Sequence, residues 1–257
     1  MNEEEKYPFT VHLEELRKRL ITSFIAIGVG FVAAYGFKEY LFGILVQPLQ
    51  SVMQEGDTLI YTNLPEAFFT YLKVALLAGI GMATPVLLYQ FWMFVAPGLY
   101  EKEKRLLLPI VFLCSFFFIG GALFGYFVVF PWGFKFFLGF ATETIRPMPS
   151  MKEYLGFAAK LLIAFGLVFE LPLVITFMAR MGIVSVAFLK KHRKYAVLLF
   201  FAGAAILTPP DVVTQVMMAM PLMLLYEISI IGARIFGRRP TEEAVEDGQP
   251  EAGETDG

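Results

Sequence analysis

The sequence LLLPIVFLCSFFFIGGALFGYFVVFPW, residues 106–132, is a continuous apolar run without a charged side chain. A helix needs about 20 apolar residues to cross the hydrocarbon core of a membrane. The whole chain of 257 residues has a similar character, since 57% of it is hydrophobic, 17% is charged and its mean hydropathy is +0.65. Soluble domains carry about 25% charged residues. The composition therefore excludes an ordinary soluble enzyme, a disordered chain and a disulfide scaffold, and it predicts an all-α protein that crosses a membrane several times.

Six membrane spans are predicted along the chain. They comprise residues 20–41, 67–94, 106–132, 154–181, 195–207 and 212–233. The last two are separate because the sequence Thr208-Pro-Pro-Asp211 removes two backbone donors and forces the chain to reverse. The fifth span has only 13 residues. That length gives about 20 Å of helix, which is short for a hydrocarbon core of about 30 Å.

The distribution of basic residues predicts the orientation of the spans. Fifteen Lys and Arg residues lie at the amino terminus, after the second and fourth spans, and at the carboxyl end, against four on the opposite side. Because basic residues collect on the cytoplasmic side of membrane proteins, we expect both termini there. The chain then divides into a cytoplasmic amphipathic segment (1–19), a six-helix transmembrane domain (20–233) and an acidic, disordered cytoplasmic tail (234–257).

One carboxylic acid, Glu170, lies inside the fourth span, in the sequence Phe165-Gly-Leu-Val-Phe-Glu-Leu-Pro172. An ionisable group at that depth is costly and usually has a function. The alternative is a neutral acid that a neighbouring helix satisfies. Pro172 leaves the carbonyl of Val168 without its helical donor, which predicts a kink where the carboxyl group projects.

Acidic residues also lie on the predicted cytoplasmic side, close to the membrane. Glu15 belongs to His12-Leu-Glu-Glu-Leu-Arg-Lys-Arg19, and Glu103 belongs to Tyr100-Glu-Lys-Glu-Lys-Arg105. Anchoring by basic residues and a solvated helix face are the simpler explanation of these charges. Several carboxylates beside a membrane groove would instead suit a cationic peptide, above all one with arginines, whose planar guanidinium group pairs bidentately.

Catalytic and redox functions find no support in the sequence. The single cysteine, Cys114, lies in an apolar run, and the two histidines, His12 and His192, lie in charged segments. No phosphate-binding loop, zinc signature or nucleophile elbow occurs. We therefore expect no catalytic site, no cofactor, no metal and no nucleic-acid partner.

Several motifs resemble those of the TatC family, the multi-spanning receptor subunit of the twin-arginine protein translocase. They occur in order between about residue 10 and residue 234, and they are spread over all six predicted spans. The motifs are His12-Leu-x-Glu-Leu-Arg-x-Arg19, Pro85-Val-Leu-Leu-Tyr-Gln90, Ala96-Pro-x-Leu-Tyr100 with Glu103 and Arg105, Tyr126-Phe-Val-Val-Phe-Pro131, Phe165-Gly-x-x-Phe-Glu-x-Pro172 and Thr208-Pro-Pro-Asp-Val-x-x-Gln215. The sequence departs from the family pattern at Glu101-Lys102, before Glu103.

The resemblance implies a concave, glove-like bundle of six helices in the bacterial cytoplasmic (inner) membrane. Glu15, Arg17 and Glu103 would bind the signal peptides of folded cargo proteins. Glu103 would be the main carboxylate that pairs with the two arginines, and Glu15 and Arg17 would belong to the amino-terminal recognition motif. Glu170 would face a polar cavity within the membrane. Such a receptor is expected to act in an oligomeric complex, and the proton gradient would drive export.

The resemblance also implies partners at the short last helices. Thr208, Asp211 and Gln215 would dock single-span subunits of the TatA/TatB type within the lipid bilayer. Two other functions remain open from the residues themselves. One is a proton-coupled secondary transporter with Glu170 as the proton carrier. The other is a purely structural membrane anchor, which Glu170 and the paired cytoplasmic acids disfavour.

Overall fold

The structure, a computed structural model, describes residues 6–54, 57–95, 107–142, 146–207 and 212–237. The elements in chain order are α1 (Lys6–Tyr35), α2 (Lys38–Gln50), α3 (Glu66–Val95), α5 (Leu107–Phe124), the π-helical turn η3 (Gly125–Val129), α6 (Phe130–Leu138), α7 (Met151–Phe169), α8 (Leu171–Arg180), α9 (Val186–Lys191), α10 (Arg193–Leu207) and α11 (Val212–Phe236). Within these ranges no strand occurs, and one isolated bridge joins Ile60 to Ser150. The prediction of an all-helical membrane protein is confirmed.

Five helical segments in the described ranges are long and apolar enough to cross a membrane. They are Val11–Tyr35, Glu66–Val95, Leu108–Leu138, Met151–Arg180 and Val212–Phe236. The predicted fifth span corresponds to α10, which has 15 residues and reaches only about 22 Å. Length and composition alone therefore support five spans, and α10 is shorter than the thickness of a typical hydrocarbon core.

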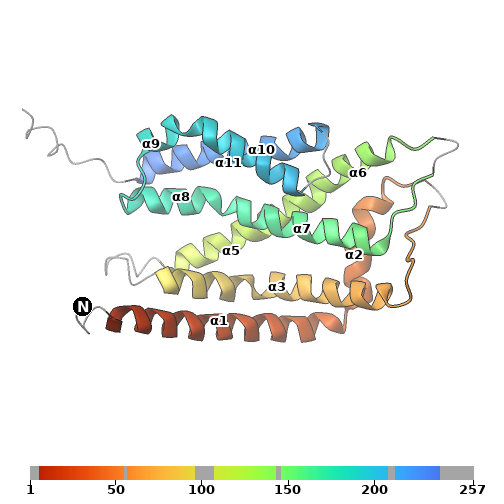
Figure 1. Ribbon diagram of the computed structural model, residues 1–257, viewed down its shortest axis with the longest axis horizontal. Helices are drawn as coiled ribbons and strands as arrows, with labels where there is room; N and C mark the ends of the chain where they lie inside the picture. Colours follow the sequence, from red (N-terminus) through yellow and green to blue (C-terminus); the bar gives the residue numbers. More distant parts are fainter. Residues whose placement is uncertain (1–5, 55–56, 96–106, 143–145, 208–211, 238–257) are drawn as a thin grey trace, which may run out of the picture.

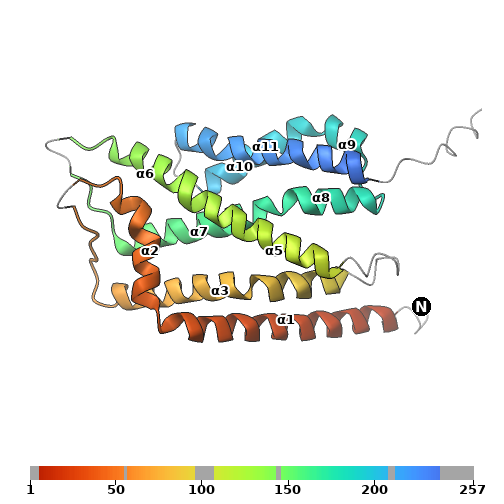
Figure 2. The same cartoon turned by 180° about the vertical axis from the view of Figure 1, so that it is seen from behind.

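The first predicted span, residues 20–41, is wrong at its carboxyl end. The helix begins at Lys6, so α1 includes most of the predicted amphipathic segment without a break at residue 19. It ends at Tyr35, and the apolar residues that follow belong to α2, which lies across the ends of α1 and α3 (Figures 1 and 2). Gly36 lies at this bend, where the low helix propensity of glycine favours an interruption that hydropathy does not reveal.

α1 packs antiparallel to α3 along one edge of the molecule (Figure 1). The two backbones approach most closely at Gly30 and Gly79. A Cβ atom on Gly30 would lie 2.7 Å from the Gly79 carbonyl oxygen, and one on Gly79 would lie 2.6 Å from the Phe31 nitrogen. Because both obstacles are backbone atoms, only glycine fits at this crossing. Much of the rest of α1 exposes apolar side chains, including those of Phe24, Ile25, Val29 and Val32.

The largest cluster of buried side chains in the described ranges lies near α2 and joins it to α6, α7, α10 and α11. Its members are Val46, Leu49, Phe130, Phe134, Tyr154, Ala158, Leu161, Phe165, Ala204 and Met218. Pro48 lacks an N–H group, so the carbonyl of Ile44 loses its helical donor. The Tyr126 hydroxyl donates to that carbonyl at 2.6 Å, and the Tyr154 hydroxyl donates to the carbonyl of Leu45 at 2.5 Å. Proline and two tyrosines therefore fix α2 against η3 and α7.

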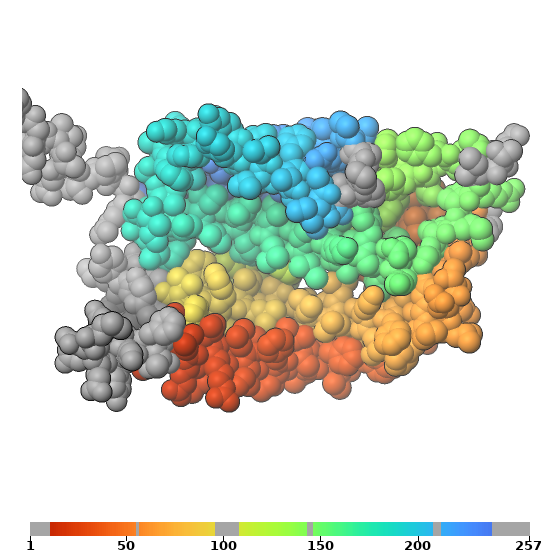
Figure 3. All heavy atoms as spheres, viewed as in Figure 1, coloured from red at the N-terminus to blue at the C-terminus, as the bar shows by residue number. Residues whose placement is uncertain are grey.

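The fourth predicted span is divided at the position that the sequence indicated. α7 ends at Phe169, α8 begins at Leu171, and Glu170 lies between them with Pro172 in the first turn of α8. The predicted kink is confirmed. Figure 3 shows α7 and α8 in the middle of the molecule, between the edge formed by α1 and the edge formed by α9 and α10.

Candidate functional site

The candidate site lies where α1 begins and α3 ends (Figure 1). The His12 ring stacks on the Phe94 ring, with centroids 4.3 Å apart and an interplanar angle of 23°. Two turns further along α1, Arg19 Nη1 donates to Gln90 Oε1 at 3.1 Å. His12, Glu15 and Arg19 have helical spacing and therefore share one face of α1. That face is held against the last turns of α3.

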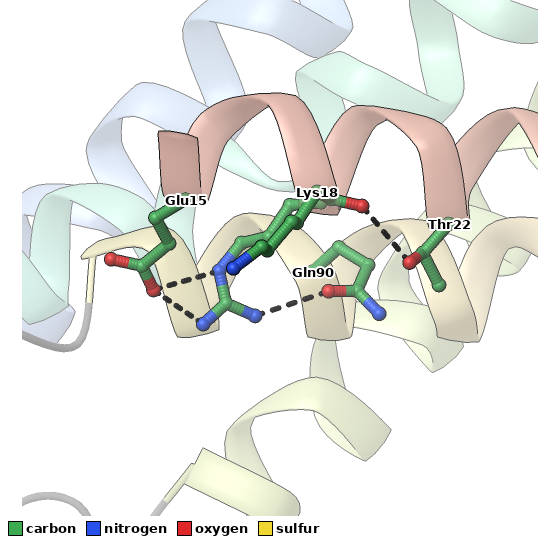
Figure 4. A network of polar contacts seen from close by, with 5 residues as sticks. Glu15, Lys18, Thr22 and Gln90 are labelled. Atoms are coloured by element: carbon green, nitrogen blue, oxygen red, sulfur yellow. Dashed lines mark hydrogen bonds and ion pairs between the residues drawn. The ribbon is translucent and has the colours of Figure 1, made fainter. Parts of the chain in front are cut away.

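Glu15 is paired within its own helix. Arg19 donates to Glu15 Oε1 from Nε at 3.0 Å and from Nη2 at 2.5 Å. Figure 4 shows Glu15 of α1 and Gln90 of α3 at the two ends of one chain of polar contacts. The side chain of Arg19 is 19% exposed and that of Glu15 is 29% exposed. The pair is therefore partly screened from solvent but still accessible.

Arg17 does not join Glu15. Two residues along a helix correspond to a rotation of about 200° around its axis, so Glu15 and Arg17 point to nearly opposite sides. Arg17 is accordingly exposed on another side of α1, together with the solvent-exposed pair of Glu14 and Lys18, whose charged atoms are 3.1 Å apart. Of the predicted amino-terminal recognition residues, the structure thus directs Glu15 towards α3 and Arg17 away from it.

Three predicted site residues, Glu103, Thr208 and Asp211, lie outside the described residues. Glu103 belongs to the segment that links α3 to α5. The described ends of those two helices, at Val95 and Leu107, lie at the end of the molecule where α1 begins (Figure 1). Across the described parts of the chain, no group of three or more His, Cys, Asp or Glu residues could hold a metal ion.

Glu170 is buried between helices, with 7% of its surface exposed. The Cys114 thiol and the backbone of Phe118, both on α5, are its polar neighbours. Its Oε1 atom has no hydrogen-bond partner among the described residues. A buried oxygen without a donor costs free energy. Burial thus keeps the Glu170 side chain away from the outer surface of the helices. Its Oε1 atom remains able to accept a hydrogen bond.

Gln215, the described member of the predicted docking set, has an internal partner. Its Nε2 atom donates to the carbonyl of Phe201 at 2.9 Å and thereby links α11 to α10. The side chain is partly buried. The sequence indicated a polar group near the outer turn of α11, but not that its amide joins the two last helices.

Glu66, which the sequence analysis did not single out, is the most extensively hydrogen-bonded carboxylate among the described residues. It is buried at the first residue of α3. Its Oε2 accepts bonds from Thr62 N at 3.0 Å, Thr62 Oγ1 at 3.3 Å and Asn63 N at 3.4 Å. Its Oε1 accepts bonds from Ser150 Oγ at 2.7 Å and Lys152 N at 3.1 Å.

The sequence did contain a local signal for one of the five Glu66 contacts, the bond from Asn63 N. Asn63-Leu-Pro-Glu66 has the spacing of a capping box, in which an acid at the third helical position reaches back to the N-cap nitrogen. The bonds to the start of α7 depend on the fold, because Ser150 lies 84 residues away in the chain. Glu66 thus joins the beginnings of α3 and α7.

Comparison with known proteins agrees over most of the chain. The family model described as Sec-independent protein translocase protein (TatC) matches residues 11–221. Two proteins named Sec-independent protein translocase protein TatC are close in sequence. The one from Desulforapulum autotrophicum is 70% identical over 95% of this chain and 92% of its own length, and the one from Magnetococcus marinus is 50% identical over 96% and 91%.

A solved structure has the same fold. The chain described as "Crystal Structure of Twin Arginine Translocase Receptor- TatC" matches with a TM-score of 0.79 and 42% sequence identity, over 88% of this chain and 99% of that one. The family match and both relatives cover far more than half of this sequence. This multi-spanning membrane protein therefore belongs to the TatC family of Sec-independent protein translocase proteins.

Proposed function

We propose that the protein is the receptor and scaffold subunit of a twin-arginine translocase. It binds the twin-arginine signal peptides of folded cargo proteins and recruits single-span TatA/TatB-type subunits for export across the bacterial inner membrane. It performs no catalysis itself, and the proton gradient drives transport. Membership of the TatC family and the likeness to a solved receptor structure support this function.

The observation that carries the proposal is the position of Glu15. Its carboxylate binds a guanidinium group, that of Arg19, through two N–H donors. It also lies beside the end of α3, from which the segment containing Glu103 continues. Two peptide arginines need two anionic partners, and we assign Glu15 and Glu103 to them. Charge-assisted bonds of this kind are among the stronger hydrogen bonds in proteins.

The proposed topology has six spans, with both termini in the cytoplasm. In this topology α10 is the fifth span, in addition to the five longer helical segments. α10 is shorter than the hydrocarbon core, and a thinned bilayer or a partner helix accommodates this difference in length. The excess of Lys and Arg at one end of the bundle supports this orientation. We assign the exposed edge at α10 and α11, with Thr208, Asp211 and Gln215, to the single-span partners in an oligomeric complex.

Crosslinking to a signal peptide tests the proposed receptor function. A photoreactive amino acid at position 101, which leaves Glu103 in place, should crosslink to a peptide with paired arginines and not to the same peptide with paired lysines. Glu103→Ala should weaken binding about tenfold or more, because a hydrogen bond to a charged group contributes about 1.5–3 kcal/mol. Glu101→Ala is the matched control and should cost less. Unchanged affinity in Glu103→Ala would remove Glu103 from the site.

The alternative of a proton-coupled transporter depends on Glu170, whose buried Oε1 has no partner within the described ranges. A transporter should bind a small solute in detergent, whereas a receptor should bind a signal peptide. We favour the receptor because the family match is to a protein translocase. Uptake of a small solute that Glu170→Gln abolishes would reverse this preference.

A further inference from the structure

Two ion pairs on α1 have the same spacing but different surroundings. Glu14 pairs with Lys18, and their side chains are 66% and 74% exposed. Glu15 pairs with Arg19, and their side chains are 29% and 19% exposed. An exposed pair at this spacing contributes only a few tenths of a kcal/mol. The second pair is more enclosed, and its guanidinium group is also bound to Gln90 on α3.

The enclosed pair already has the geometry of arginine recognition. Two N–H donors of Arg19 converge on a single carboxylate oxygen of Glu15, at 3.0 and 2.5 Å. The third contact, from Nη1 to Gln90 Oε1 at 3.1 Å, holds the guanidinium group from α3 (Figure 4). Both bonds end on Oε1. A second arginine that pairs bidentately with the two carboxylate oxygens therefore has to displace at least one N–H group of Arg19.

We propose that Arg19 is an internal competitor for the Glu15 carboxylate: a peptide arginine binds Glu15 by displacing the Arg19 guanidinium group. This inference rests on the proposed receptor function. Gln90 keeps one hydrogen bond to Arg19 when Glu15 is released, so the displaced side chain remains at the interface between α1 and α3. Binding is then an exchange of one guanidinium group for another on the same carboxylate.

The exchange sets affinity, whereas the preference for arginine has a separate cause. A peptide lysine offers a compact ammonium group, which does not reproduce the fixed pair of N–H donors that an arginine presents. Both peptides must release the same Arg19 contact before they bind Glu15. The competitor therefore lowers the affinity of both peptides by the same factor, and the arginine peptide keeps its better fit to the carboxylate.

Peptide titrations on the full-length protein in detergent test this proposal. Arg19→Gln should tighten binding of a fluorescent twin-arginine peptide by about threefold to tenfold, which corresponds to removal of part of a charge-assisted bond. It should tighten binding of the paired-lysine peptide by a similar factor, because both peptides displace the same Arg19 contact. Lys18→Gln, which removes the same charge one residue away from an exposed pair, should change affinity less than Arg19→Gln does.

Arg19→Lys keeps the charge and the helical pair but removes the planar donor group. It should tighten binding to an intermediate degree, and it provides the test if Arg19→Gln does not fold. Unchanged or weaker binding in Arg19→Lys would overturn the competitor. The proposed function is tested separately by Glu15→Gln, which should lose affinity whatever Arg19 does. If Glu15→Gln binds normally, the receptor assignment of Glu15 fails, and not merely the competition.

Discussion

Two carboxylates at opposite ends of α1 and α3 have different degrees of hydrogen-bond satisfaction. Glu66, where α3 begins, accepts five hydrogen bonds on its two oxygens and is 6% exposed. Glu15, near the start of α1, is 29% exposed in its side chain and receives its two bonds from one neighbour in its own helix. A saturated carboxylate joins elements of the fold. A carboxylate that holds a single exchangeable partner can bind a ligand. The same residue type thus serves structure at one end and, in the proposed receptor, recognition at the other.

Loss of Glu66 should have the largest effect on the stability of the folded protein. Glu66→Ala leaves Ser150 Oγ and the backbone nitrogens of Thr62 and Lys152 without their acceptor. We expect the Tm in detergent to fall by roughly 5 °C or more, because several hydrogen bonds to a charged group are lost together. Glu153→Ala is the control, since that side chain is exposed in the first turn of α7. Equal Tm values for the two variants would show that the Glu66 cluster does not join α3 to α7.

Disturbing the crossing of α1 and α3 should come next. Gly79→Ala places a Cβ atom 2.6 Å from the Phe31 nitrogen, so the backbones must separate. Overpacking of this kind costs about 1–3 kcal/mol. Gly81→Ala lies one half-turn away, where a Cβ atom meets nothing within 4 Å, and it should be neutral or stabilising. Thermal unfolding of both variants measures the difference, and a neutral Gly79→Ala would contradict the close approach.

Gln215→Leu should have a smaller effect, confined to the last two helices. The change removes the bond from Nε2 to the carbonyl of Phe201. Interhelical hydrogen bonds in membranes contribute about 0.6–2 kcal/mol. We therefore expect weaker association with single-span partners, measured by crosslinking at α10 and α11, with the fold retained. Full partner crosslinking in Gln215→Leu would remove this residue from the docking edge.

Glu170→Leu should change stability least, because the substituted carboxyl group already lacks one hydrogen-bond partner among the described residues. Leucine also suits the apolar surroundings. The Tm should remain close to that of the unmodified protein, whereas export of a twin-arginine cargo should be lost. Glu170→Gln keeps a polar group and should retain folding. Normal export by Glu170→Leu would make Glu170 a packing residue, with no role in transport.

The sequence predicted those parts of the fold that depend on continuous apolar runs with polar boundaries. The prediction of residues 67–94 corresponds to α3 (Glu66–Val95), and that of residues 212–233 to α11 (Val212–Phe236). The first span failed because the apolar pattern continues through Gly36, and a change in helix direction leaves no trace in hydropathy. Pro172 did reveal the break at Glu170, because a missing backbone donor is a local property.

Only those features of the candidate site that depend on residue type and local motif could be predicted from the sequence. Glu15 could be selected by its charge and its motif, but the contact between Arg19 and Gln90 spans 71 positions and depends on the register of α1 against α3. The bond from Ser150 to Glu66 could not be predicted for the same reason, because the two residues are 84 positions apart in the sequence. Pairings between distant segments are set by packing, which one sequence does not display.

A double-mutant cycle on peptide affinity measures whether Glu15 and Glu103 bind one arginine pair together. The dissociation constant of a twin-arginine peptide should rise about tenfold or more in Glu15→Ala and in Glu103→Ala. The double variant should show a coupling energy of roughly 0.5 kcal/mol or more, because the two residues share one ligand. Strict additivity would place them at separate sites, and unchanged affinity in both single variants would exclude both residues from arginine binding.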